Sequence, residues 1–207
     1  MAQLLIATNN RGKVRELQAI LDGLPAALVT PHDLGLHFEV DETGATYAEN
    51  ARLKALAFAQ ASGLITVADD SGLEVDALDG APGLHSARYA GPGMSDADRR
   101  AKLVAALRAV PAPRRARFRC VIAVAGPNPA GPAPELAFFE GVCEGEILLE
   151  ERGRGGFGYD PLFFVPTLGQ TMAELAAETK NRLSHRARAT LAARPHLLSL
   201  FTAAGMP

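Results

Sequence analysis

The stretch QLLIATNNRGKVRELQAIL, from Gln3 to Leu21, predicts a strand, a polar turn and a helix in that order. The apolar run from Gln3 to Thr8 is typical of a buried strand. Apolar residues with helical spacing follow at Val14, Leu17, Ile20 and Leu21. The turn between them is Asn9-Asn10-Arg11-Gly12. A strand, a turn and a helix in this order indicate an α/β protein.

The rest of the chain continues this mixture of strands and helices. Further strands are predicted at Ile65–Ala68, Arg117–Ala125 and Leu136–Glu146, the last two joined by a Pro/Gly-rich loop tip from Gly126 to Pro134. Helices are predicted from the capping box at Thr46 to about Ser62, from Ser95 to about Val110, over Met172–Ala177, and from Ser184 onward. We expect Pro195 to kink that last helix or to start a new one. Residues 1–207 are interpreted as one domain, in which an α/β sheet has helices on its faces.

Composition excludes several classes of protein. The formal net charge is -2, which gives no general attraction to nucleic acid or to an anionic membrane. Cys120 and Cys143 lie in separate apolar stretches, so we expect two core thiols rather than a disulfide framework or a zinc cluster. No signal peptide and no transmembrane run is recognisable, so a cytoplasmic protein is expected.

Two polar clusters suggest a site for phosphate and metal. Thr8 to Lys13 opens a helix, where backbone N–H groups and a lysine favour an anion. It is not a Walker A loop, and an ordinary capped turn is the alternative. Asp69-Asp70-Ser71-Gly72 follows a buried strand, and with Glu42 it offers carboxylates of the kind that Mg²⁺ prefers. The alternative for this cluster is a β-turn built from Asp, Ser and Gly.

Two further clusters suggest recognition of a base. Four glycines surround two aromatic residues in Gly153–Pro161, and such a loop can offer a ring for base stacking. The alternative is a tight turn whose aromatic residues point inward. In Lys180–Arg186, Ser184 would cap the last helix and place His185 and Arg186 in its first turn, where cations oppose the helix dipole unless a ligand compensates them. A solvated basic face is the alternative.

Together these clusters resemble one family, the inosine triphosphate pyrophosphatases, which act on non-canonical purine nucleoside triphosphates. Six matches occur in the family's order and cover nearly the whole chain. They are Ala7–Lys13, Glu42–Gly44 with Glu49–Ala51, Ala68–Leu73, Pro82–Gly83 with Ser86–Tyr89, Gly155–Pro161 and Ser184–Arg186. The resemblance implies a mixed α/β fold with an elongated central sheet, helices on both faces and two lobes that form a cleft. It also implies a homodimer.

The resemblance assigns roles to individual residues. The triphosphate would be held by Thr8, Asn9, Asn10, Arg11, Gly12 and Lys13. Asp70 would be the general base and, with Glu42, a ligand of Mg²⁺, while Ser71 would contact substrate. The base would be bound by Phe157, Gly158, Tyr159, Asp160, Lys180, His185 and Arg186. The implied reaction hydrolyses ITP, dITP or XTP to the monophosphate and pyrophosphate, cleansing the nucleotide pool.

The expected chemistry is attack of water at the α-phosphorus. Donors from Arg186 and His185 would bind the 6-oxygen of hypoxanthine or xanthine and leave the amine of adenine unpaired. We expect Arg186→Ala to reduce turnover of ITP far more than it changes folding. A pyrophosphatase for pyrimidine or modified nucleotides is one alternative. A non-catalytic nucleotide sensor is another, although such a sensor would be expected to lack a carboxylate at position 70 or 42.

Overall fold

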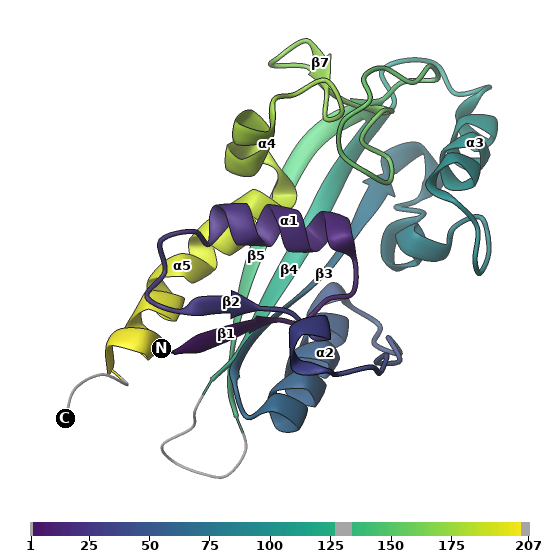
Figure 1. Ribbon diagram of the computed structural model, residues 1–207. Coiled ribbons are helices and arrows are strands. Elements are labelled where there is room, and N and C mark those ends of the chain that lie inside the picture. The colour runs from purple at the N-terminus through teal and green to yellow at the C-terminus, as the bar shows by residue number, and fades with distance from the viewer. Residues whose placement is uncertain (1, 127–133, 204–207) are drawn as a thin grey trace. The chain divides into compact units, whose positions relative to one another are not determined.

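The structure, a computed structural model, describes residues 2–126 and 134–203. Its seven-stranded sheet has the order β2-β1-β3-β4-β5-β6-β7 (Figure 1). The strands are β1 (Gln3–Ile6), β2 (Ala27–Val29), β3 (Ile65–Val75), β4 (Arg115–Gly126), β5 (Glu135–Ile147), β6 (Phe163–Val165) and β7 (Gln170–Thr171). Because β1 pairs in parallel with β2 and β3, whereas β6 pairs antiparallel with β5 and β7, the sheet is mixed, as predicted.

Helices lie between and after these strands along the chain, and the mixture confirms the α/β class. They are α1 (Arg11–Ile20), α2 (Tyr47–Ser62), α3 (Asp96–Leu107), α4 (Ala177–Leu183) and α5 (His185–Ala203), with short 3-10 helices at His32–Leu34, Asp76–Leu78 and Gly83–Arg88. Within residues 2–126 and 134–203, no helix combines the length and the hydropathy that a membrane span needs. Apart from its two ends, the predicted loop tip Gly126–Pro134 lies outside the described residues.

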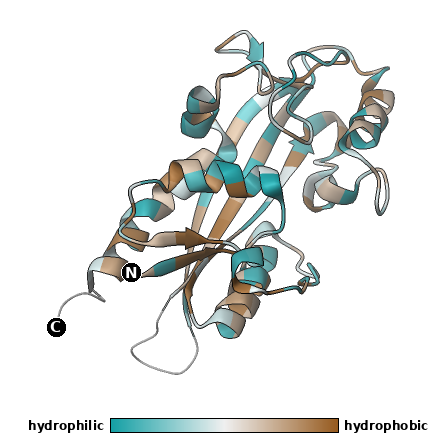
Figure 2. Cartoon of the chain, in the orientation of Figure 1, coloured by the Kyte–Doolittle hydropathy of each residue, from teal (hydrophilic) through white to brown (hydrophobic). Residues whose placement is uncertain are grey.

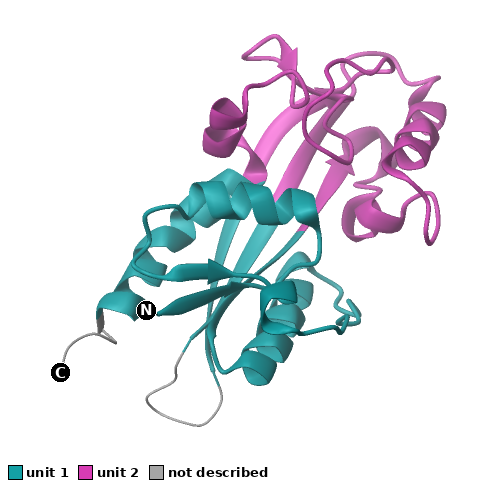
Figure 3. Ribbon diagram, in the orientation of Figure 1, with its two compact units in different colours: residues 1–70, 120–141, 186–207 teal, residues 71–119, 142–185 magenta. Residues whose placement is uncertain are grey.

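The chain forms two compact units (Figure 3). Unit 1 comprises residues 1–70, 120–141 and 186–207, and unit 2 comprises residues 71–119 and 142–185. Strands β3, β4 and β5 contribute residues to both units. The interpretation of residues 1–207 as a single domain and the expected cleft stay predictions.

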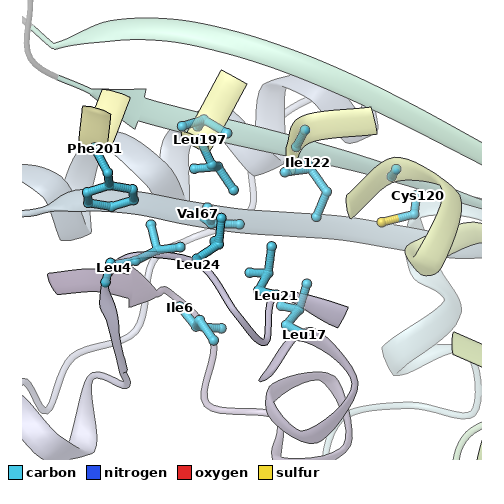
Figure 4. Packing of buried hydrophobic residues seen from close by; sticks show 14 residues of the cluster. Leu4, Ile6, Leu17, Leu21, Leu24, Val67, Cys120, Ile122, Leu197 and Phe201 are labelled. Carbon is cyan, nitrogen blue, oxygen red and sulfur yellow. The ribbon is translucent and has the colours of Figure 1, made fainter. Parts of the chain in front are cut away.

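The core of unit 1 lies between strands and the helices α1 and α5. Leu17 of α1 and Leu21, the C-cap of that helix, pack in one cluster with Leu4 of β1 and Val67 of β3 (Figure 4). Every fourth residue of α5 joins this cluster, at Ala189, Ala193, Leu197 and Phe201. Figure 2 shows the strands of this unit largely apolar and α1 with both apolar and polar positions. An amphipathic α1 was predicted from the same spacing.

The core of unit 2 contains residues of α3 and of the parts of β3, β4 and β5 that belong to this unit. Leu103 and Leu107 of α3 are fully buried and belong to one cluster with Leu73 of β3. The Phe118 and Phe163 rings lie 4.4 Å apart in the same cluster. Each unit therefore has its own apolar core. Cys120 belongs to the core of unit 1 and Cys143 to the core of unit 2. Cys120 and Cys143 are free and buried, as predicted.

The structure corrects one predicted helix and excludes one of the two alternatives for another. Residues 172–175 form a turn and a bend rather than a helix, and the helix begins only at Ala177. Pro195 lies inside α5 and so does not start a new helix, while the expected kink stays a prediction. The buried neighbours Ala193 and Leu197 pack on the sheet, and this tertiary packing outweighs the missing backbone hydrogen bond.

Candidate active site

The predicted phosphate loop is the N-terminus of α1. Asn10 is the N-cap, and its Oδ1 accepts from the N–H groups of Gly12 at 2.8 Å and Lys13 at 3.1 Å. The Thr8 hydroxyl oxygen accepts from the Asn10 N–H at 3.2 Å. Two of the N–H groups expected to bind phosphate are therefore already occupied by a side chain. Anion binding here depends on displacing Asn10 or on the side chains themselves.

The other residues of this loop differ in exposure. Asn9 and Arg11 are exposed, whereas Gly12 is buried and Lys13 is half-buried. The Lys13 ammonium lies 3.0 Å from Oδ2 of Asp69. The loop and the two neighbouring aspartates are thus brought together within unit 1, as the sequence clusters predicted.

Strand β3 does not end before the aspartates. It runs through Asp69 and Asp70 to Val75, so the alternative of a β-turn is excluded. Successive side chains of a strand point to opposite faces, and the two carboxylates accordingly have different neighbours. Asp69 contacts Lys13 and Arg186, whereas Asp70 contacts residues of α2.

Asp69 is a buried, ion-paired carboxylate. Its side chain is fully buried, and its Oδ2 lies 3.0 Å from Lys13 and 3.2 Å from Nε of Arg186. Burial alone would raise the pKa of Asp69, but the two cations together outweigh burial and hold the pKa well below its usual value. Asp69 therefore stays ionised and serves to fix the two cations beside it.

Asp70 has the opposite balance. Its Oδ2 accepts from the Asn50 amide at 3.1 Å, and its Oδ1 lies 3.5 Å from the Lys54 ammonium. Burial raises the pKa of Asp70, and Lys54 and Lys13 offset this effect only in part. A carboxylate with a raised pKa beside cations is suited to accept a proton.

Sequence reasoning missed Lys54, and it gave no role to Asn50, which lies in the match Glu49–Ala51. The Lys54 ammonium bridges two carboxylates, at 2.5 Å from Oε1 of Glu42 and 3.5 Å from Oδ1 of Asp70. Burial would lower the pKa of Lys54, but the surrounding carboxylates of Asp70, Asp69 and Glu42 raise it overall. Asn50 and Lys54 are four residues apart on α2 and so share a face, which is the signal that would have identified them.

The donor set of Glu42 and Asp70 fits a shared metal ion. No group of three or more His, Cys, Asp or Glu side chains in the described part of the chain is arranged to hold a metal by itself. Mg²⁺, however, is commonly bound by one or two carboxylates together with water and substrate phosphates. Glu42 and Asp70 already surround one cationic group, that of Lys54.

Arg186 occupies the first turn of α5, as predicted, but its guanidinium is engaged within unit 1. The residue is 2% exposed, and its side chain contacts Asp69 at 3.2 Å and Glu16 at 2.5 Å. Burial would lower the pKa of Arg186, but these two carboxylates outweigh burial and raise the pKa above its usual value. The expected role in reading the base stays a prediction, and the structure supports a role in holding Asp69.

The predicted base-binding residues of unit 2 converge around Asp160. Its Oδ2 accepts from the Phe157 N–H at 2.9 Å and from the Lys180 ammonium at 2.6 Å. The same ammonium lies 5.2 Å from the centre of the Phe157 ring. Phe157 is half-buried, whereas Asp160 and Lys180 are buried. The Asp160 carboxylate thus binds both the backbone of Phe157 and the ammonium that lies near the Phe157 ring.

Other predicted residues of unit 2 are more deeply placed. Tyr159 belongs to the core, and its hydroxyl donates to the Ser86 carbonyl at 2.9 Å. For this aromatic residue the inward-pointing alternative holds. His185 is buried and stacks on Phe118 with ring centres 4.6 Å apart. Ser71 lies in β3 and is half-buried.

These two groups of residues, one in each unit, include the carboxylates, the lysines and the aromatic ring that the resemblance named. A family model described as the Ham1 family matches residues 4–196. The chain belongs to the Ham1 family. Membership confirms the resemblance on which the roles of Asp70, Phe157 and their neighbours were predicted.

Relatives of known name cover almost the whole chain. A dITP/XTP pyrophosphatase of Geobacter sulfurreducens is 50% identical over 198 residues, which are 95% of this chain and 97% of that protein. A dITP/XTP pyrophosphatase of Xanthomonas oryzae is 51% identical over 203 residues, or 97% of this chain and 100% of that protein. The solved structure of a HAM1 protein from Coxiella burnetii matches with a TM-score of 0.82 at 41% identity, covering 98% of this chain and 100% of that one.

Proposed function

We propose that this Ham1 family member hydrolyses dITP, ITP and XTP to the nucleoside monophosphate and pyrophosphate in a reaction that requires Mg²⁺. The observation that carries the proposal is the buried Asp70 carboxylate, which has a raised pKa and lies beside Lys54 and Asn50. The name shared by relatives about half identical to this chain supports the choice of substrate.

Glu42 and Asp70 would hold the metal ion together with the substrate phosphates. When bound, Mg²⁺ neutralises phosphate charge and orients the leaving pyrophosphate. The two carboxylates provide oxygen ligands, and Lys54 already shows that both reach one cationic group. Lys54 would then be free to contact a phosphate oxygen, because a bound metal replaces the charge that it supplies to the carboxylates.

Asp70 would accept the proton of the attacking water. The water oxygen bonds to the α-phosphorus, its proton passes to an oxygen of Asp70, and the bond to the bridging oxygen of pyrophosphate breaks. Asn50, which donates to Oδ2 of Asp70, keeps the carboxylate in place during this transfer. The ammonium of Lys13 would stabilise negative charge on the phosphates, and Asp69 keeps that ammonium oriented.

Base recognition is assigned to the residues around Asp160. The exposed part of the Phe157 ring would stack on the purine. Lys180 carries hydrogen-bond donors, and a 6-oxygen accepts such donors whereas the 6-amine of adenine does not. Asp160 binds the Lys180 ammonium, which lies close to the ring. His185 and Arg186 remain predicted contributors to this selectivity.

We infer a homodimer from the family resemblance, and we keep the cytoplasmic location as the sequence predicted it. We also infer that the protein acts on free nucleotides, with no nucleic acid or membrane partner. The net charge of -2 supports this last inference, since it offers no general attraction to polyanions.

The experiment that tests the reaction is product analysis of dITP hydrolysis in water enriched in oxygen-18. The proposal predicts dIMP that carries the label, with unlabelled pyrophosphate, and no product in EDTA. Release of inorganic phosphate with dIDP would contradict it, because water would then attack the γ-phosphorus. Asp70→Asn serves as the matched inactive control, since it retains the volume of the side chain.

A further inference from the structure

The start of α3 contacts the loop that contains Phe157. Oδ2 of Asp96 accepts from the Gly158 N–H at 2.8 Å. One helical turn later, Nη1 of Arg100 donates to the Gly158 carbonyl at 3.0 Å. Both backbone polar groups of one residue are therefore bound by two side chains of one helix. Neither Asp96 nor Arg100 was among the residues that the sequence singled out.

The two residues belong to the face of α3 that is anchored in the core. Asp96, Arg100, Leu103 and Leu107 are spaced four, three and four residues apart, so they form one stripe along the helix. Leu103 and Leu107 are fully buried in the core of unit 2. The apolar half of the stripe thus fixes the helix, and the polar half holds the loop.

Phe157 is held on its other side by Asp160. The Phe157 N–H donates to the Asp160 carboxylate at 2.9 Å, and its carbonyl accepts from the Asp160 N–H at 3.2 Å. The next N–H along the chain is the one that Asp96 binds. The backbone around the half-buried ring is therefore bound before and after the ring, by groups from two different parts of unit 2.

Further contacts stabilise the hydrogen bonds of Asp96 and Arg100 to Gly158. Arg100 also lies 2.8 Å from the Glu151 carboxylate, which helps to orient the guanidinium. Burial would raise the pKa of Asp96, but the Gly158 N–H and Arg99 outweigh burial and lower the pKa, so Asp96 accepts as a carboxylate at neutral pH. Gly158 has a φ of 61°, a left-handed conformation that glycine adopts without the steric cost of a β-carbon.

We propose that Asp96 and Arg100 are positioning residues that hold the Phe157 ring in the orientation that receives the purine base. The inference rests on the proposed function, since it assigns these residues to binding of the base rather than to cleavage of the phosphate. A ring that is already placed costs less ordering when the base binds. The two residues should therefore set KM and leave kcat nearly unchanged.

Asp98 offers a matched control on the same helix turn. It forms a capping box with Ser95 at the start of α3. The Asp98 N–H donates to the Ser95 hydroxyl at 3.2 Å, and the Asp98 carboxylate accepts from the Ser95 N–H at 2.9 Å. Removing it weakens the helix start without removing a contact to Gly158. Asp96→Asn is the conservative variant, because an amide oxygen can still accept from the Gly158 N–H.

The first measurement is hydrogen–deuterium exchange of the peptide that spans Gly156 to Asp160, without nucleotide. Exchange should rise about tenfold in Asp96→Ala and Arg100→Ala and stay near wild type in Asp98→Ala and Asp96→Asn. Unchanged exchange in both alanine variants would overturn the inference. This result would be independent of whether the protein is a pyrophosphatase.

The second measurement is KM and kcat for dITP in the same variants. We expect KM to rise about tenfold in Asp96→Ala, with kcat within about twofold of wild type, and no further rise in KM when Asp96→Ala is added to Phe157→Ala. Faster exchange with an unchanged KM would overturn the assignment to base binding. A wild-type protein inactive on dITP and XTP would instead contradict the proposed function, together with the part of the inference that concerns nucleotide.

Discussion

Asp69 and Asp70 are adjacent in β3, yet their carboxylates have opposite electrostatic environments. Asp69 is paired with Lys13 and Arg186, which lower its pKa. Asp70 is buried with less compensation, and its pKa is raised. Neighbouring carboxylates with diverging pKa values are a mark of divided roles. We infer that Asp69 stabilises the structure and that Asp70 takes part in the reaction.

Asparagine at each of these positions should therefore have opposite effects on stability. Asp69→Asn leaves Lys13 without its carboxylate partner and Arg186 with Glu16 alone. Breaking a buried ion pair typically costs about 3–5 kcal/mol, which lowers Tm by about 10 °C. Asp70→Asn removes a buried charge and should leave Tm unchanged or raise it by a few degrees, while it abolishes hydrolysis. Thermal unfolding in EDTA at neutral pH measures both. Equal losses of Tm would contradict the division of roles.

The pH dependence of stability should show the same contrast. The folded pKa of Asp69 lies below its unfolded value, so its contribution is present above about pH 4 and is lost as the pH falls further. The folded pKa of Asp70 lies above its unfolded value, so Asp70 favours folding below about pH 4, and that advantage is lost as the pH rises. The Tm difference between wild type and Asp69→Asn should shrink under acid. A difference independent of pH between 3 and 7 would count against the assignment.

Lys54 should compete with the metal ion. Its ammonium neutralises Glu42 and Asp70, so Lys54→Gln leaves these carboxylates without a cation in metal-free protein. We expect Mg²⁺ to raise the Tm of Lys54→Gln more than that of wild type, because no ammonium has to be displaced. Lys102→Gln, in unit 2, is the control. An equal Mg²⁺-induced shift in Lys54→Gln and wild type would argue that Glu42 and Asp70 do not hold the metal.

Removal of the Phe157 ring should weaken binding of substrate. Stacking of a base on an aromatic ring contributes about 1–3 kcal/mol, so Phe157→Ala should raise KM for dITP by about 5- to 100-fold. Phe157→Tyr keeps the ring and should remain close to wild type. Steady-state kinetics with dITP measures the effect. If Phe157→Ala had wild-type KM, the ring would not contact the base.

Gly156 is constrained by Asp160. It has a φ of 73°, and a β-carbon added there would overlap the Asp160 carboxylate. Gly156→Ala should therefore lower Tm and, since it displaces Asp160 from Phe157 and Lys180, also raise KM. Gly169 is a suitable control, because it has a φ of 67° and no atom within 4 Å of an added β-carbon. Gly169→Ala should show backbone strain alone, with unchanged KM. Equal KM in the two variants would contradict the role of Asp160.

Local patterns predicted the regular parts of the fold well. The capping signals at Ser95 and Thr46 gave the starts of α3 and α2, because helix starts depend on side chains within a few residues. The end of β3 was predicted too early, after Ala68. Charged residues are normally absent from a buried strand. Here Lys13 and Arg186, which are distant in sequence, neutralise Asp69 within the strand.

The site was predicted in part, and the misses have one cause. Resemblance indicated Asp70, Phe157 and Lys180, but the roles of the supporting residues Lys54, Asn50, Asp96 and Arg100 emerged only from their contacts. Their roles depend on which distant groups they face, and a sequence does not give this. For the same reason Arg186 looked free to read a base. Because its guanidinium is buried between Asp69 and Glu16, we now expect Arg186→Ala to lose stability as well as turnover.

The rate of pyrophosphate release from dITP, XTP, dGTP and dATP, with Mg²⁺ and with EDTA, tests the proposed activity in wild type and Asp70→Asn. We predict rapid release from dITP and XTP with Mg²⁺, little from dATP, whose 6-amine does not accept from Lys180, and none in EDTA or in Asp70→Asn. Release from none of the four nucleotides by wild type, or undiminished release by Asp70→Asn, would contradict the proposal that Asp70 activates water for hydrolysis of these purine triphosphates.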